Sequence, residues 1–175
     1  MKFTNISFIG GIHGVGKSTI CNAICVSVGY KHLSASEVLK WAEINSDKHN
    51  KKVSDISLTQ NKLILGLQQT ILNTEKYLLD GHFCLLDSKN KITKIPFATF
   101  ETINPQSLHL VVGDAIEIKN RLESRDGKSY DLRLLEGMQQ MELDYAIEIS
   151  NKLGISLSRI KNGNYDRTIE ILAKV

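Results

Sequence analysis

A glycine-rich segment near the N-terminus constrains the fold more than any other feature of this sequence. Residues 11–18 read GIHGVGKS and match the pattern G-x-x-x-x-G-K-[ST]. They follow an apolar run, Ile6 to Ile12, and open a helical pattern, Lys17 to Val28. A strand, loop and helix in this order aim backbone N–H groups and the positive end of the helix dipole at a phosphate. The residues expected to form this phosphate-binding loop are Gly11, Gly14, Val15, Gly16, Lys17, Ser18 and Thr19.

Two side chains of the loop and one acid further along predict phosphoryl-transfer chemistry. Lys17 can reach the β and γ phosphates of a nucleotide, and the Ser18 hydroxyl can ligate Mg²⁺. Asp80 ends the apolar run YLLD, and carboxyl ends of strands face the ligand in sheets of this type, so Asp80 is expected at the metal. The alternative for Asp80 is a strand-end acid that caps a turn. His82, two residues on, either orients a ligand or is an ordinary polar residue at a strand end.

Apolar runs alternate with helical patterns along the chain. The expected strands are Ile6 to Ile12, Tyr30 to Leu33, Tyr77 to Phe83, Leu108 to Gly113 and Ile155 to Lys161. The expected helices are Lys17 to Val28, Ala35 to Ile44, Leu58 to Asn73, Ala115 to Ser124, Leu132 to Leu153 and Asp166 to Ala173. Strands that are apolar on both faces, joined by helices, predict an α/β fold with a parallel sheet covered on both sides. Residues 1–175 are expected to form one domain, in which the polar segments 45–57, 88–105 and 125–131 are irregular.

Three arginines surround the third polar segment. Arg121 and Arg125 are four positions apart and share one face of a helix, and Arg133 follows the segment. Guanidinium groups pair bidentately with phosphates and stabilise charge in a transferring phosphoryl group, so these arginines are candidate catalytic residues. The alternative is a solvated helix face on which Arg121 pairs with Glu117.

Composition excludes several other classes of protein. The net charge is +3 without a long basic cluster, which makes a nucleic-acid partner unlikely. No apolar stretch approaches the roughly 18 residues of a membrane span, and the N-terminal apolar run lacks a cleavage-site pattern. The cysteines, Cys21, Cys25 and Cys84, are odd in number and lack metal-site spacing. A reducing cytoplasm is the expected location, and no sequence feature bears on the oligomeric state.

The loop GIHGVGKST, the strand end LLDGH and the run R-L-x-x-R-x-G resemble the adenylate kinase branch of P-loop kinases, particularly the archaeal-type adenylate kinases. This resemblance extends from about Ile6 to Asn164. It implies a three-layer P-loop kinase fold with a five-stranded sheet of order 2-3-1-4-5. It also implies an acceptor-binding arm over residues 34–57, a short lid over residues 125–133, and a loop with Asn162 and Gly163 that cradles the base of the donor nucleotide.

Two departures from that family concern the phosphoryl acceptor. The family usually has an arginine in the acceptor arm, but residues 35–73 contain only lysines: Lys40, Lys48, Lys51, Lys52 and Lys62. It also usually has an arginine on the helix after the lid, where Leu134 to Ser150 holds no basic residue. Lysine cannot reproduce a bidentate guanidinium fork.

The resulting expectation is transfer of a phosphoryl group from ATP, with Mg²⁺, to a small acceptor, first a nucleoside monophosphate. Two alternatives stay open. One is a regulatory or assembly ATPase that acts on a macromolecular partner, and the other is a kinase of a non-nucleotide metabolite or of a nucleic-acid end.

Overall fold

Five parallel strands form the centre of the molecule in the computed structural model, which describes residues 2–45, 56–87, 89–161 and 163–175. The strands are β1 (Ile6–Gly10), β2 (Lys31–Ser34), β3 (Tyr77–Asp80), β6 (Leu108–Val112) and β7 (Leu157–Lys161), in the spatial order β2-β3-β1-β6-β7. Counted along the chain, this order is 2-3-1-4-5. The expected sheet is therefore confirmed.

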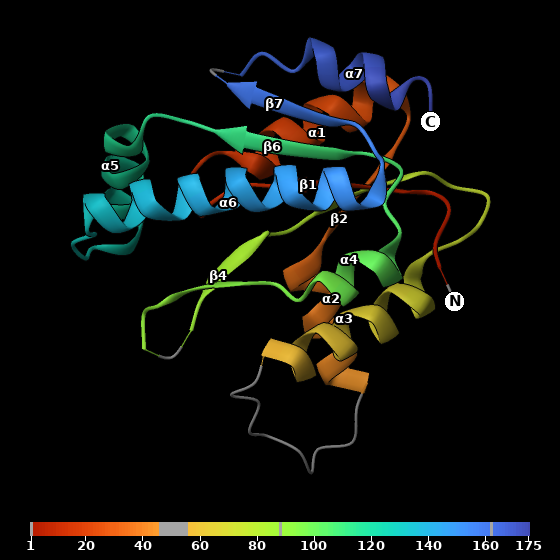
Figure 1. Cartoon of the computed structure of the whole chain (residues 1–175), viewed down its shortest axis with the longest axis horizontal. Coiled ribbons are helices and arrows are strands. Elements are labelled where there is room, and N and C mark those ends of the chain that lie inside the picture. Colours follow the sequence, from red (N-terminus) through yellow and green to blue (C-terminus); the bar gives the residue numbers. More distant parts are fainter. Residues whose placement is uncertain (1, 46–55, 88, 162) are drawn as a thin grey trace.

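Helices cover both faces of this sheet (Figure 1). They are α1 (Lys17–Val28), α2 (Ala35–Asn45), α3 (Ile56–Thr70), α4 (Phe97–Ile103), α5 (Ala115–Asp126), α6 (Leu132–Leu153) and α7 (Asp166–Leu172). Helices α1 and α7 pack together on one face, and α6 packs on the other with α4, which in turn contacts α3. Figure 1 shows α2, α3 and α4 grouped below the sheet, away from α7.

Successive side chains of β1 point to opposite faces of the sheet, which explains why the hydrophobic core forms two clusters, one on each face. Ile6 and Phe8 belong to the buried cluster beneath α3, α4 and α6, whereas Ile9 belongs to the cluster beneath α1 and α7. All five residues of β1 are buried, as expected for the central strand of a sheet covered on both sides.

One segment expected to be irregular is ordered. Within it, residues 89–105 contain β5 (Ile92–Lys94), which pairs antiparallel with the preceding β4 (Cys84–Leu86) to form a hairpin, and then α4. The Asp87 carboxylate accepts the backbone N–H groups of Lys89 and Lys91, which closes the turn. Pro96 and Asn104 bracket the seven residues of α4, so the prolines limit this helix without preventing it.

The strand registers place the carboxyl ends of β1, β2 and β3 next to one another. Ile9 and Ser34 both lie opposite Asp80, so Asp80 ends β3 between the end of β1 and the end of β2.

None of the described helices is long and apolar enough to cross a membrane. The expected acceptor-arm lysines Lys48, Lys51 and Lys52, and the expected base-cradling Asn162, lie outside the described residues.

Candidate functional site

The loop between β1 and α1 has the backbone that its glycines predict. Gly14 and Gly16 adopt φ angles of 77° and 96°, in the left-handed region that favours glycine. A Cβ atom on Gly14 would lie 2.7 Å from the Leu122 side chain, so the loop packs closely on α5. Gly16 is the N-cap of α1, and the helix begins directly at Lys17. The N–H groups of the first turn therefore point into the loop.

Lys17 folds back across this loop. Its Nζ donates to the carbonyl oxygen of Gly11 at 2.7 Å and lies 3.9 Å from Oδ1 of Asp80. Burial lowers the pKa of Lys17, and the Asp80 charge partly offsets that shift. The ammonium thus lies beside the carboxylate at the end of the neighbouring strand.

Asp80 is 7% exposed and lies among several donors and acceptors. The His32 Nε2 atom is 3.6 Å from Asp80 Oδ2, is buried, and has no hydrogen-bond partner in the described structure. Ser18, at the start of α1, lines the same cleft as Asp80. A hydroxyl and a carboxylate are hard oxygen ligands of the kind Mg²⁺ prefers, so these two residues fit such an ion.

A second buried carboxylate lies behind His82. Glu142 on α6 is 1% exposed, and its Oε1 accepts the backbone N–H groups of Phe83 and Cys84 at 2.9 and 3.1 Å. Its Oε2 has no hydrogen-bond partner within the described structure. The His82 Nδ1 atom, also unpartnered there, lies 3.7 Å from Glu142 Oε1. Glu142 therefore fixes the backbone that follows Asp80 and places a negative charge behind the His82 ring.

The other side of His82 faces the phosphate-binding loop. Its ring centroid is 4.3 Å from that of His13. Withdrawal from water lowers the pKa of His13 to about 4, and the neighbouring His82, Lys17 and Arg125 act in the same direction. His13 is therefore neutral at pH 7 and adds no charge to the loop.

One cleft joins the loop to the grouped helices. Its volume is about 670 Å³, and its walls include Lys17, Ser18, Asp80 and His82. The wall continues away from the loop along α2, α3, the hairpin and α4, with Leu39, Gln60, Leu63, Leu85, Ile95, Thr99, Phe100 and Ile103. We call the part lined by these eight residues the inner pocket.

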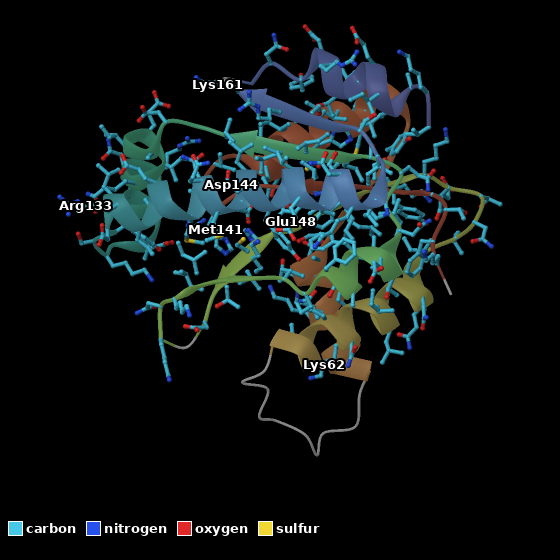
Figure 2. All side chains as sticks on the ribbon, viewed as in Figure 1. Lys62, Arg133, Met141, Asp144, Glu148 and Lys161 are labelled. Atoms are coloured by element: carbon cyan, nitrogen blue, oxygen red, sulfur yellow. The ribbon has the colours of Figure 1, made fainter. Side chains whose placement is uncertain are left out.

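The structure brings two of the three candidate arginines to the cleft. Arg121 and Arg125, on α5, both line it. Arg125 is engaged with its neighbour Asp126, to which Nε and Nη2 donate at 2.6 and 2.9 Å. Arg133 is exposed and does not line the cleft, and Figure 2 places it at the end of α6 that lies beside α5.

The remaining candidate binding residues fall into two groups. Thr19, Gly14 and Gly16 line the cleft, whereas Gly11 and Val15 support the loop from its buried side. Gly163 follows β7 with a φ of 73° and does not line the cleft.

Three polar residues of the site escaped the sequence analysis. Glu142 stands in the buried stripe of α6, and an acid at such a position was the available signal. Gln60 and Thr99 are 7% and 6% exposed and line the inner pocket. They had no sequence signal, because each belongs to a segment without a recognisable motif.

A phosphate-binding loop that joins the first strand of a 2-3-1-4-5 parallel sheet to its helix, with a carboxylate ending the neighbouring strand, defines the P-loop class of nucleotide-binding proteins. A family model described as AAA domain matches residues 10–138, and the chain belongs to this family.

Curated relatives are kinases at low sequence identity. UMP-CMP kinase 3 of Oryza sativa subsp. japonica is 27% identical over 133 residues, which are 71% of this chain and 60% of that protein. Adenylate kinase isoenzyme 1 of Homo sapiens is 32% identical over 91 residues, 47% of each chain. The chain therefore spans about half to three-fifths of the length of these relatives.

Solved structures share the fold. A gluconokinase from Sinorhizobium meliloti 1021 aligns with a TM-score of 0.54 and 14% identity over 99% of this chain and 92% of that chain. A sugar kinase from Janibacter sp. HTCC2649 aligns with a TM-score of 0.52 and 16% identity over 98% and 91% of the two chains. The three-layer P-loop kinase fold is thus established.

Proposed function

We propose that this protein is an ATP-dependent kinase that transfers the γ-phosphoryl group to a small acceptor held in the same cleft. The observation that carries the proposal is the continuity of the cleft, in which the loop with Lys17 opens directly into the inner pocket. A donor phosphate at the loop and an acceptor in the pocket would meet beside Asp80. Positioning of this kind is most of what a phosphoryl-transfer enzyme contributes.

The residues of the loop have distinct roles in this proposal. Lys17 holds the β and γ phosphates after giving up its contact with the Gly11 carbonyl. Ser18 and Asp80 would hold Mg²⁺, which when bound neutralises developing charge on the phosphates. Arg121 and Arg125 stand at the open side of the loop and add positive charge around the transferring group. Arg133 and the base-cradling role of Asn162 and Gly163 stay predictions.

Nucleoside monophosphates are the first acceptors to assay, because the curated relatives are named UMP-CMP kinase and adenylate kinase. The structural neighbour named gluconokinase makes gluconate a useful second kind of acceptor. An assay with γ-labelled ATP separates transfer to an acceptor from hydrolysis, since the label appears in a different product.

Replacement of Lys17 by Ala tests the proposal at its centre. The variant loses the charge that faces the β and γ phosphates, so turnover should fall at least about 10²-fold while the fold survives. Lys152→Ala, an exposed lysine on α6, is the matched control and should keep full activity. Unchanged ATP affinity and turnover in a folded Lys17→Ala protein would show that the loop does not bind nucleotide phosphates.

A further inference from the structure

Three side chains of the kinds that bind metal ions meet behind the phosphate-binding loop. Cys21 stands one turn after Lys17 on α1, His32 belongs to β2, and Asp80 ends β3. The Cys21 sulfur, a ring nitrogen of His32 and a carboxylate oxygen of Asp80 all lie within 4.8 Å of one another. Within the described ranges of the chain, this is the only such group of three histidine, cysteine or acidic side chains.

The sheet and α1 bring these three residues together. Ser34 lies opposite Asp80 in the strand register and His32 comes two residues before Ser34, so all three side chains point to the same face of the sheet. Leu78, two residues before Asp80, belongs with Cys21 to the buried cluster beneath α1. The group therefore lies between the sheet and α1, where Cys21 is fully buried and Asp80 is 7% exposed.

The ring of His32 is held as a metal ligand would be. Its Nδ1 lies 3.2 Å from Oδ1 of Asn22, and an amide oxygen only accepts, so Nδ1–H is the donor. The neutral ring then has a lone pair on Nε2. This atom is buried, lies 3.6 Å from Oδ2 of Asp80, and has no hydrogen-bond partner among the described residues. Ligating histidines are commonly oriented by such a bond from the other ring nitrogen to an oxygen.

We propose that Cys21, His32 and Asp80 form a binding site for Zn²⁺. A sulfur, an imidazole nitrogen and a carboxylate oxygen are the ligands that Zn²⁺ takes in proteins, whereas Mg²⁺ takes oxygen ligands. Three protein ligands leave the fourth tetrahedral position to a water molecule.

Formation of the site is a ligand exchange without oxidation or reduction. The bond from sulfur to zinc forms as the Cys21 thiol gives its proton to the solvent, and the nitrogen and oxygen lone pairs replace two waters of the hydrated ion. At the usual bond lengths, ligand atoms around zinc are about 3.5 Å apart, so the widest pair would close by no more than about 1.3 Å.

The proposed zinc site shares Asp80 with the nucleotide site. Oδ1 of Asp80 lies 3.9 Å from the Lys17 ammonium, and Oδ2 faces His32. Asp80 is the only carboxylate among the described residues that line the cleft. One carboxylate cannot balance the charges of two divalent cations, which repel each other at such short range. Zinc and Mg²⁺ with ATP should therefore exclude each other, a consequence that rests on the proposed kinase function.

Metal titration tests the site without any assay of activity. The reduced, chelator-treated protein is titrated with Zn²⁺ against a chromophoric chelator, and one ion per chain should bind with a Kd of about 1 μM or tighter. Co²⁺ serves as a spectroscopic probe of the same ligands. It should give the charge-transfer absorption that a thiolate ligand produces, together with the intense visible bands of a tetrahedral ion.

Two variants and a matched control locate the ion. Cys21→Ala and His32→Gln each remove one ligand, and each should weaken Zn²⁺ binding at least about tenfold. Cys21→Ala should also abolish the charge-transfer band of Co²⁺. Cys25→Ala, which removes a buried thiol one turn further along α1, should keep both the affinity and the band. The His32 side chain is 21% exposed, so His32→Gln serves as the second variant should Cys21→Ala fail to fold.

Competition tests the shared carboxylate. Saturating Mg²⁺ and ATP should raise the apparent Kd for Zn²⁺ at least about tenfold in the unmodified protein. A chelator buffer sets the free Zn²⁺ concentration, because ATP itself binds zinc. In the same buffers, half-inhibition of ATP turnover should require at least about tenfold more free Zn²⁺ in Cys21→Ala than in Cys25→Ala.

The outcomes separate the zinc site from the kinase function. Absence of Zn²⁺ binding at micromolar concentration would overturn the site, and so would equal affinities in the two ligand variants and the control. Zinc that binds through Cys21 and His32 without being displaced by Mg²⁺ and ATP would overturn the mutual exclusion. A protein that binds zinc at these residues but neither binds nor turns over ATP would support the site and refute only the kinase function.

Discussion

Asp80 and Lys17 carry opposite charges 3.9 Å apart, at a place where each is less than one-tenth exposed. Such a pair is stabilised by mutual attraction but is costly to break, because a lone buried charge would remain. Bound phosphates and Mg²⁺ would exchange these partners, with Lys17 turning to phosphate and Asp80 to the metal. Under the proposed function, the energy of this ion pair would be replaced on binding by the contacts of Lys17 with phosphate and of Asp80 with the metal.

Asp80→Asn tests that exchange. The variant keeps the shape of the side chain but loses the charge that would hold Mg²⁺, so turnover should fall at least about tenfold and the apparent Mg²⁺ requirement should rise. ATP binding without metal should change little or tighten. A magnesium titration of activity is the measurement, with Asp144→Asn, exposed on α6 (Figure 2), as the control. An unaltered titration would assign Asp80 to a structural turn.

Glu142 gives a prediction about stability. Glu142→Ala leaves the buried N–H groups of Phe83 and Cys84 without an acceptor, which should lower the free energy of unfolding by about 2–4 kcal/mol. Glu142→Gln keeps a carbonyl oxygen for the two donors and should lose less. Urea unfolding measures both, and Glu136→Ala, exposed on the same helix, should change the stability by less than about 0.5 kcal/mol. Equal losses in the Ala and Gln variants would show that the two hydrogen bonds do not carry the effect.

Helix α5 carries the cationic side of the cleft, and its last turn is held in place locally. Asp126 accepts hydrogen bonds from Arg125 and from the Tyr130 hydroxyl, so the carboxylate ties the end of the helix to the link that follows. Arg125 therefore lines the cleft while paired with Asp126, and in the proposed reaction it would have to leave Asp126 to contact a phosphoryl group.

Arg125→Lys keeps the charge of this side chain and removes its planar fork. If Arg125 clamps the transferring group, turnover should fall at least about tenfold while ATP affinity changes little. Steady-state kinetics combined with calorimetric ATP binding separate the two effects. A proportional loss in both would indicate that Arg125 only attracts the nucleotide.

The elements differ in how far the sequence alone could predict them. Helices α1 and α6 begin and end at the expected residues, because Gly16 and Gly29 bracket the first and Asp131 and Gly154 the second. The hairpin escaped because each of its strands has three residues, too short for a periodic pattern. Helix α4 escaped because the prolines on either side of it, Pro96 and Pro105, favour an irregular segment. The site divides in the same way. Lys17 and Asp80 could be predicted because one belongs to a sequence motif and the other ends a strand. Gln60 and Thr99 could not, because they come to line the same cleft only when α3 packs against α4 in the folded chain.

At the scale of the whole molecule, acid should weaken the fold through His109. This residue is buried on β6, where its ring bonds to Ser107 Oγ at 2.9 Å and to Ser158 Oγ at 2.7 Å. Burial lowers its pKa to about 3 from an ordinary value of 6.5. Below about pH 6.5 the unfolded chain therefore binds a proton that the folded chain does not, and the free energy of unfolding falls by up to about 1.4 kcal/mol per pH unit.

Urea unfolding between about pH 7 and pH 5 measures this slope, in a range where the carboxylates stay ionised. His109→Gln removes the titrating ring, so its stability should depend less steeply on pH, whatever its stability at pH 7. His13, with a pKa lowered to about 4, contributes in the same direction and leaves a residual slope. Identical slopes in the two proteins would show that His109 is not the group responsible.

The central position of β1 has a consequence for synthesis. Its neighbours are β3 and β6, and Ser7 meets Ser107 across 100 positions of chain. A ribosome that adds about 5–20 residues per second needs roughly five to twenty seconds to deliver that partner. For this time β1, whose five residues are all buried in the folded protein, is already made and has no strand to pair with on one side. The nascent chain therefore passes through a stage at which a trigger-type chaperone has its best opportunity to bind, and slowing translation between β3 and β6 should increase aggregation more than slowing it after β7.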